Sequence, residues 1–288
     1  MKVCVELPVE SRGIARVRDN LIKYKPDSVE IVKNATEADL TILHVIGRHD
    51  RVERQVNNLR ASGKQYAMIQ YCIRSTMSPS TADWINMWKG ARLVWSYYYL
   101  PELVWQDHVS ESFPFYYAPL GVDADVFKES PFYKQFVVGA TSQHALSEGA
   151  RECAIASQHT NKEMFFLGHE LRRSNVHCAS GLSDDKVASY WSKCKYISGL
   201  RRIEGFELPV IEGLMCGARP IVYDQPHYRA WFDKFAVFIK EGSREEVIEQ
   251  LEVLFARDPN PVTEEEKVLA KSMFNWQTII TNFWKQLI

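Results

Sequence analysis

The sequence lacks the features that mark membrane, secreted disulfide-rich or nucleic-acid-binding proteins. No stretch reaches the roughly 18 apolar residues of a membrane-spanning helix. The six cysteines are scattered without a Cys-x-x-Cys pair, which is typical of small buried side chains in a reducing compartment. The 35 basic and 36 acidic residues give a net charge of -1, so no global field favours nucleic acid or an anionic membrane.

Motifs for phosphate and metal binding are also scarce. The sequence contains neither a Walker loop nor a Gly-x-Gly-x-x-Gly run. Asp123-Ala124-Asp125 spells the Asp-x-Asp of metal-dependent transferases, and no other cluster of His, Cys, Asp or Glu has the spacing of metal ligands. We therefore expect no metal and no other cofactor.

The composition that remains is that of a globular protein. Hydrophobic residues make up 46% and charged residues 25% of 288 residues, a length sufficient for two domains with separate cores. Glu6 and Glu10 interrupt the apolar run that a signal peptide would need. These observations predict a cytoplasmic protein.

Short apolar runs alternate with segments of helical period, the pattern of parallel βαβ units. In the first half, the pattern predicts strands over 2–7, 28–32, 39–46, 65–73 and 92–99, with helical segments over 14–24, 50–62, 81–91 and 102–109. The pattern restarts after residue 130. There it predicts strands over 133–141, 162–168 and 176–180, helices over 147–158, 183–194 and 244–258, and apolar runs over 195–200, 218–224 and 235–239. Two Rossmann-like halves are predicted, with ligands at the carboxyl ends of their strands.

Three segments carry a resemblance to a known family. Residues 118–127, APLGVDADVF, resemble the interdomain signature of the retaining family-4 (group 1) glycosyltransferases. Residues 204–222, EGFELPVIEGLMCGARPIV, resemble that family's motif of two glutamates separated by seven residues. Residues 244–258 and 274–287 resemble its last two helices, whereas the first half matches mainly at 11–22.

The resemblance implies the α/β GT-B fold, with two Rossmann-like domains facing each other across a cleft. Residues 1–125 would form the acceptor domain, 126–272 the nucleotide-sugar donor domain, and 273–288 a C-terminal helix that returns to the first domain. The implied activity is transfer of a sugar from a nucleotide-sugar, a UDP- or GDP-sugar, with retention of configuration and without a metal. The acceptor is unidentified: a glycan, a small molecule or a modified nucleic-acid base.

The resemblance also implies roles for individual residues. Glu204 would contact hydroxyls of the donor sugar, and Glu212 would hold the ribose, because a carboxylate can accept from two hydroxyls at once. Gly205, Phe206, Glu207 and Leu208 precede a predicted helix, so their backbone amides can face the sugar or the diphosphate, and the glycines of this motif leave room for backbone to approach the phosphates.

Further candidates come from both halves. Gly139, near the end of a predicted strand, would bind the donor, and Gly13 would let acceptor and donor phosphate approach the backbone. His44 is predicted to contact the donor sugar, with a satisfied core histidine as the alternative, and His49 is a candidate of the same kind or a solvated loop residue. The aromatic residues around Tyr97, Tyr98 and Tyr99 suit either a core or a stacking surface, and the core is favoured.

One departure from the family concerns the diphosphate. Ala140 and Glu148 stand where the family has an arginine and a lysine that bind it. Arg201 and Arg202 are the candidates to take their place, and the alternative is that both are solvated surface arginines. Strand alternation lets only one of them point at the phosphates, with Arg151 next in line. The departure keeps two alternatives open: a nucleotide-sugar binding protein without catalysis, and a nucleotide-sugar epimerase on the same fold. The Asp123–Asp125 pair falls in the linker and is interpreted as structural.

Overall fold

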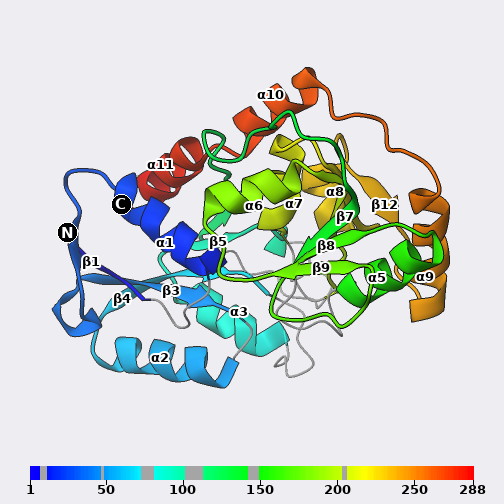
Figure 1. Ribbon diagram of the computed structural model, residues 1–288. Coiled ribbons are helices and arrows are strands. Elements are labelled where there is room, and N and C mark those ends of the chain that lie inside the picture. Colours follow the sequence, from blue (N-terminus) through cyan, green and yellow to red (C-terminus); the bar gives the residue numbers. More distant parts are fainter. Residues whose placement is uncertain (7–11, 47–48, 73–80, 101–112, 142–148, 203–205) are drawn as a thin grey trace. The chain divides into compact units, whose positions relative to one another are not determined.

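A computed structural model describes residues 1–288 apart from 7–11, 47–48, 73–80, 101–112, 142–148 and 203–205 (Figure 1). The chain divides into two compact units, and each unit is made of segments that are not continuous in the sequence. Unit 1 comprises Met1–Leu120, Ile203–Phe206 and Trp276–Ile288, and unit 2 comprises Gly121–Arg202 and Glu207–Asn275.

Unit 1 is built on a parallel six-stranded sheet. Its strands in spatial order are β2 (Glu30–Val32), β1 (Lys2–Val5), β3 (Leu40–Val45), β4 (Gln65–Gln70), β5 (Val94–Ser96) and β6 (Phe115–Tyr117). Its helices are α1 (Arg12–Lys23), the 3-10 turn η1 (Ala35–Glu37), α2 (His49–Ala61), α3 (Thr81–Lys89) and α11 (Trp276–Leu287). Every residue of β3 is buried, because a central parallel strand is covered on both faces.

The C-terminal helix α11 belongs to unit 1, where it lies beside α1 (Figure 1). The Trp284 indole N–H donates to Leu21 O at 3.1 Å. The Tyr116 hydroxyl of β6 donates to Ile279 O at 2.8 Å, and the Phe283 ring lies 5.4 Å from that of Trp95 on β5. The last helix is therefore anchored by aromatic side chains whose polar groups all find backbone acceptors.

Unit 2 is built on a second parallel six-stranded sheet. Its strands in spatial order are β12 (Val237–Ile239), β11 (Arg219–Tyr223), β10 (Cys194–Gly199), β7 (Phe136–Thr141), β8 (Met164–Leu167) and β9 (Val176–Ala179). Its helices are α5 (Ala150–His159), α6 (Asp184–Trp191), α7 (Leu208–Met215), α8 (Pro226–Phe232), α9 (Arg244–Phe255) and α10 (Glu264–Met273). Helices α5 and α9 pack side by side (Figure 1).

Two glycines of unit 2 bring helices close to the sheet. A Cβ atom on Gly213 of α7 would lie 2.7 Å from the side chain of Ile197 on β10. A Cβ atom on Gly139 of β7 would lie 2.8 Å from the indole of Trp191 on α6. Both distances are too short for a side chain, so these glycines permit helix–sheet packing. Gly213 therefore serves the core, where the sequence had suggested that the glycines of its motif admit phosphates.

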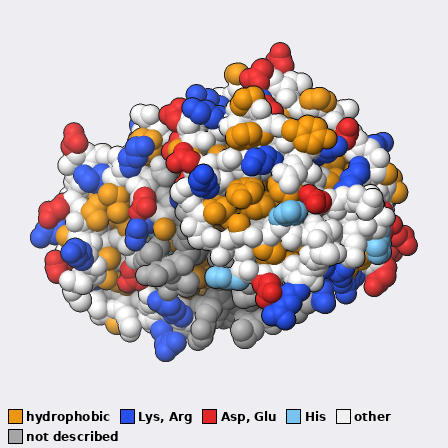
Figure 2. Space-filling model, in the orientation of Figure 1, with side chains coloured by type: hydrophobic (Ala, Val, Ile, Leu, Met, Phe, Trp, Pro, Cys, Tyr) orange, Lys and Arg blue, Asp and Glu red, His pale blue; other side chains and the backbone are white. Residues whose placement is uncertain are grey.

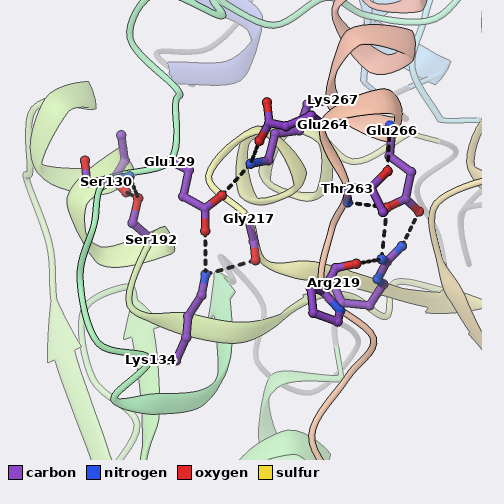
Figure 3. A network of polar contacts seen from close by, with 12 residues as sticks. Glu129, Ser130, Lys134, Ser192, Gly217, Arg219, Thr263, Glu264, Glu266 and Lys267 are labelled. Carbon is purple, nitrogen blue, oxygen red and sulfur yellow. Dashed lines mark hydrogen bonds and ion pairs between the residues drawn. The ribbon is translucent and has the colours of Figure 1, made fainter.

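A polar network fastens α10 to the sheet of unit 2 (Figure 3). Arg219 begins β11, and its guanidinium donates to both carboxylate oxygens of Glu266, at 2.5 and 3.0 Å. The same guanidinium donates to the backbone oxygens of Asn260, Pro261 and Phe235. Glu266 also completes the capping box at the start of α10.

A second part of this network holds the segment before β7 (Figure 3). Lys134 donates to Gly217 O at 2.9 Å and lies 3.8 Å from Glu129. Lys267 of α10 pairs with both Glu129 and Glu264. The two parts together tie α10, the turn after α7 and the chain before β7 to one another.

The surface in Figure 2 carries positive and negative side chains interspersed over the visible face, in keeping with the net charge of -1. No helix in the described ranges is long and apolar enough to cross a membrane.

Candidate functional site

The double-glutamate motif is described from Phe206 onward. Glu204 and Gly205 lie outside the described residues, as does Glu148. Phe206 is buried in unit 1, and Leu208 begins α7 in unit 2, as the sequence predicted for the helix after this run. Glu207 lies directly before α7 as its N-cap residue, where the positive end of the helix dipole favours a carboxylate.

Arg201 and Glu207 form a buried ion pair in unit 2. Arg201 Nε lies 2.8 Å from Glu207 Oε2, and the two side chains are 11% and 2% exposed. Arg201 Nη2 also donates to Thr141 O, at 3.2 Å, the last residue of β7. The guanidinium thus lies at the carboxyl ends of β7 and β10, and Glu207 supplies the charge that makes its burial tolerable.

Arg202 lies differently. Its guanidinium donates to Gly242 O at 2.9 Å and to a Glu241 carboxylate oxygen at 3.2 Å, and it lies over the ring of Tyr223 at 5.3 Å. The two consecutive arginines therefore take separate partners. Both follow the end of β10 at Gly199, so strand alternation, on which the prediction for them rested, does not apply to them. Arg201 is the one near the end of β7.

Glu212 is buried within α7 and contacts α6. The Trp191 indole N–H lies 3.5 Å from Glu212 Oε2, and the same indole covers Gly139 of β7. Two of the predicted donor-binding residues, Glu212 and Gly139, thus lie against the same side chain, Trp191. Trp191 falls in the helix predicted over 183–194, and nothing in its helical spacing distinguishes it from a core residue.

Ala140 is a core residue of β7, with 1% of its surface exposed. An arginine at this position would have to leave the core to reach a ligand. Arg151 is exposed on α5. The described part of the site therefore holds one inward-facing cation at the end of β7, Arg201, already paired with Glu207.

His44 of β3 is buried in unit 1 with 3% of its surface exposed. Its Nδ1 lies 2.9 Å from the Tyr71 hydroxyl, and the two rings are stacked at 5.8 Å with an interplanar angle of 16°. Burial, together with the positive charge of Arg18 on α1, lowers the pKa of His44 to about 3. His44 is therefore neutral at physiological pH. His49 begins α2, and its side chain lies outside the described residues.

Phe206 joins the same cluster within unit 1. Its ring lies 5.6 Å from that of Tyr97, whose hydroxyl donates to Tyr71 O at 2.5 Å. Phe206, Tyr97 and Tyr71 thus form a continuous path of contacts to His44. Tyr97 and Tyr98 are buried, as the core interpretation of the aromatic run predicted, whereas Tyr99 is 45% exposed.

The remaining predicted residues lie in turns and helix ends. Gly13 is the second residue of α1, inside the first helical turn. The Asp125 backbone N–H donates to Asp123 Oδ1 at 3.1 Å, so this pair closes a turn on itself. Among the described residues, no group of three His, Cys, Asp or Glu side chains is arranged to hold a metal ion.

Comparison with known proteins rests on structure. No protein-family model and no curated protein matches the sequence. HepE of Anabaena, solved in complex with UDP, is 12% identical, and the match covers 99% of this chain and 98% of that one with a TM-score of 0.74. Sucrose-phosphate synthase of Thermosynechococcus elongatus is 11% identical, with 99% and 97% covered and a TM-score of 0.73.

A third solved structure, a glycosyltransferase involved in avilamycin A biosynthesis, is 11% identical over 99% of this chain and 96% of that one, with a TM-score of 0.60. These likenesses extend over nearly the whole chain. The protein has the GT-B fold, as the sequence predicted.

Proposed function

We propose that this protein is a glycosyltransferase that moves a sugar from a nucleotide-sugar to an acceptor with retention of configuration. The observation that carries the proposal is the GT-B fold along 99% of the chain, shared with HepE, which has been solved with UDP-glucose and with UDP and glucose. A UDP-sugar is therefore the donor to test first. The acceptor class stays open between a glycan, a small molecule and a modified nucleic-acid base.

In this proposal, catalysis consists of positioning and electrostatics. Glu204 contacts the donor sugar, Glu212 holds the ribose, and Arg201 meets the charge that develops on the leaving diphosphate. The backbone amides of Glu207 and Leu208, at the start of α7, are assigned to the donor, together with Gly205 and Phe206 as the resemblance implies. Gly13 is assigned to the approach of the acceptor and the donor phosphate. No nucleophilic side chain of the protein is required, and no metal is invoked.

The primary test is a donor screen followed by a turnover assay. Thermal unfolding is recorded with UDP, GDP and their glucose, N-acetylglucosamine and mannose derivatives, since a ligand at a hundredfold excess over Kd stabilises a protein by about 2.7 kcal/mol. Release of nucleoside diphosphate from a binding donor is then measured with and without a panel of saccharide acceptors. Acceptor-dependent release supports the transferase, and NMR of the product's anomeric proton decides retention. Failure of every nucleotide to bind contradicts the proposal.

A binding protein without catalysis is the second candidate, and one observation favours it. Ala140 lies in the core of β7, and the carboxylate of Glu207 already neutralises Arg201. A diphosphate therefore meets less positive charge here than two unpaired cations would supply. Such a protein would be stabilised by a nucleotide-sugar and release no nucleoside diphosphate, whereas an epimerase would convert the donor with no acceptor present.

Arg201→Ala is expected to weaken binding of UDP about tenfold or more and to leave binding of uridine nearly unchanged. A hydrogen bond to a charged group is worth about 1.5–3 kcal/mol, and only the diphosphate carries the charge that Arg201 meets. Arg202→Ala is the matched control, because that side chain is tied to Glu241 and Gly242 instead. Isothermal titration of both ligands against both variants measures the difference.

Arg201→Ala leaves the buried Glu207 carboxylate without its cation, which destabilises the fold. The double variant Arg201→Ala/Glu207→Gln removes that charge as well, so its affinity for UDP tests the phosphate contact separately from folding. It should show the same loss of UDP affinity as Arg201→Ala alone. If neither arginine separates UDP from uridine, the phosphate contact lies elsewhere, and Arg151 is the next residue to substitute.

EDTA is expected to leave turnover intact, because the proposed mechanism stabilises the leaving group with protein charges and amides. The assay compares rates before and after chelation and after adding back Mg²⁺ or Mn²⁺. Activity that is abolished by EDTA and restored only by a divalent ion would assign Asp123 and Asp125 to a metal site. Their substitution by asparagine would then remove the metal response.

A further inference from the structure

His44 carries one hydrogen-bonded ring nitrogen and one that has no partner among the described residues. Nδ1 lies 2.9 Å from the Tyr71 hydroxyl. Nε2 is buried and has no hydrogen-bond partner in the part of the chain that the structure describes. A buried polar atom left in this way costs about 1–3 kcal/mol, so its persistence at the end of β3 points to a ligand.

The hydroxyl of Tyr71 decides which nitrogen of His44 holds the proton. Among the described residues, that hydroxyl has one hydrogen-bond partner, His44 Nδ1. If Nδ1 held the proton, it would donate to the phenol oxygen, and the phenol proton would then have no acceptor in the described part of the chain. The other tautomer lets the phenol proton point at Nδ1 and leaves a single group unsatisfied, the N–H at Nε2.

The charge state of the pair agrees with this arrangement. Burial raises the pKa of Tyr71 well above its usual value, so the phenol keeps its proton. Burial and the charge of Arg18 lower the pKa of His44 to about 3, so the imidazole stays neutral. A neutral N–H donor is suited to an uncharged oxygen, such as a sugar hydroxyl, and gains less from a phosphate than a cation would.

We propose that Tyr71 is a positioning residue that fixes His44 in the Nε2–H tautomer, so that His44 donates one hydrogen bond to an uncharged oxygen of the bound substrate. The assignment of that substrate as a donor sugar rests on the function proposed above. The tautomer itself does not. Tyr97 and Phe206 support Tyr71 through the contacts already described.

The tautomer is read directly from ¹⁵N NMR of histidine side chains, because protonated and bare imidazole nitrogens have well-separated shifts. His44 is assigned by comparison with His44→Gln. In the wild-type protein we expect Nε2 to show the protonated shift and Nδ1 the bare one. Tyr71→Phe keeps the stacked ring and the backbone acceptor of Tyr97 but removes the phenol, so the His44 signals should report a mixture of tautomers.

Tyr97→Phe is the matched control. It removes a buried hydroxyl that donates to the backbone oxygen of Tyr71 and leaves the Tyr71 phenol in place, so the His44 signals should not change. A wild-type His44 protonated at Nδ1, or a Tyr71→Phe spectrum identical to that of the wild type, overturns the proposal whether or not the protein turns over a donor.

The functional arm is a double-mutant cycle on donor turnover. Tyr71→Phe should lower kcat about tenfold, the upper end of what one neutral hydrogen bond is worth. In a His44→Gln background, where an amide replaces the ring and has no tautomer, the same change should have little further effect. Equal losses in both backgrounds would show that Tyr71 acts on packing alone. Absent turnover in every variant would count against the transferase and leave the NMR result to decide the tautomer.

Discussion

Arg219→Ala is expected to lower the free energy of unfolding by about 3 kcal/mol, the cost of breaking a buried charged pair from one side. The substitution removes all five hydrogen bonds that the guanidinium makes, two of them to Glu266 and three to backbone oxygens. It also leaves the Glu266 carboxylate without its cation. Urea unfolding followed by circular dichroism measures the loss through the transition midpoint.

Glu264→Gln is the control for this prediction. Glu264 lies on the same helix, pairs with Lys267 and has an 81% exposed side chain. An ion pair whose carboxylate is this exposed is worth about 0.5 kcal/mol or less, so the variant should unfold close to the wild type. If Arg219→Ala unfolds at the same urea concentration as Glu264→Gln, the network in Figure 3 does not stabilise the packing of α10.

The same network predicts a response to acid. Burial works to raise the pKa of Glu266, but hydrogen bonds from Arg219 and from the Thr263 backbone bring it below its usual value. A carboxyl whose folded pKa is depressed contributes stability above its unfolded pKa of about 4.3 and loses it as pH falls through the folded value. Arg219→Ala should therefore show a shallower decline of stability below about pH 4.3 than the wild type.

The sequence predicted many of the strands and helices because apolar runs and helical periodicity mark them. Six consecutive buried residues make β3 recognisable, and α11 carries an apolar face that its sequence displays over 12 residues. β6 was not predicted, since alternation cannot be recognised over the three aromatic residues of Phe115–Tyr117. α10 was missed although Thr263 and Glu266 form a capping box, because the helix buries a single residue and shows no apolar stripe.

The site was predictable only as far as local pattern reaches. Arg201 and Arg202 follow the end of β10 at Gly199, so the strand alternation expected for them does not set their directions. Their side chains take separate partners, and no local pattern could have chosen which one would lie beside Thr141. The pairing of Arg201 with Glu207 depends on how β10 and the start of α7 meet, which no spacing encodes. His44 was open between core and ligand contact, and the structure gives it a property of each: burial, and one ring nitrogen with no protein partner among the described residues.

Glu212→Ala is expected to raise the Kd of UDP about tenfold to a hundredfold. If Glu212 holds the ribose, the variant loses a hydrogen bond to a charged acceptor, worth about 1.5–3 kcal/mol, and each 1.4 kcal/mol is a factor of ten in affinity. The side chain is buried on α7 against Trp191, so circular dichroism must first show that the variant folds. Glu212→Gln keeps the shape and one acceptor oxygen, and it should lose less affinity than alanine.

The ligand itself provides the sharper comparison. The wild type should bind 2′-deoxy-UDP more weakly than UDP, because the carboxylate then has one hydroxyl fewer to accept from. Glu212→Ala has no ribose acceptor at this position, so it should bind the two ligands almost equally. Trp191→Phe removes the indole N–H that contacts Glu212 and leaves the carboxylate in place, and it should retain the wild-type preference. A Glu212→Ala protein that still prefers UDP over its deoxy form would remove Glu212 from the ribose site.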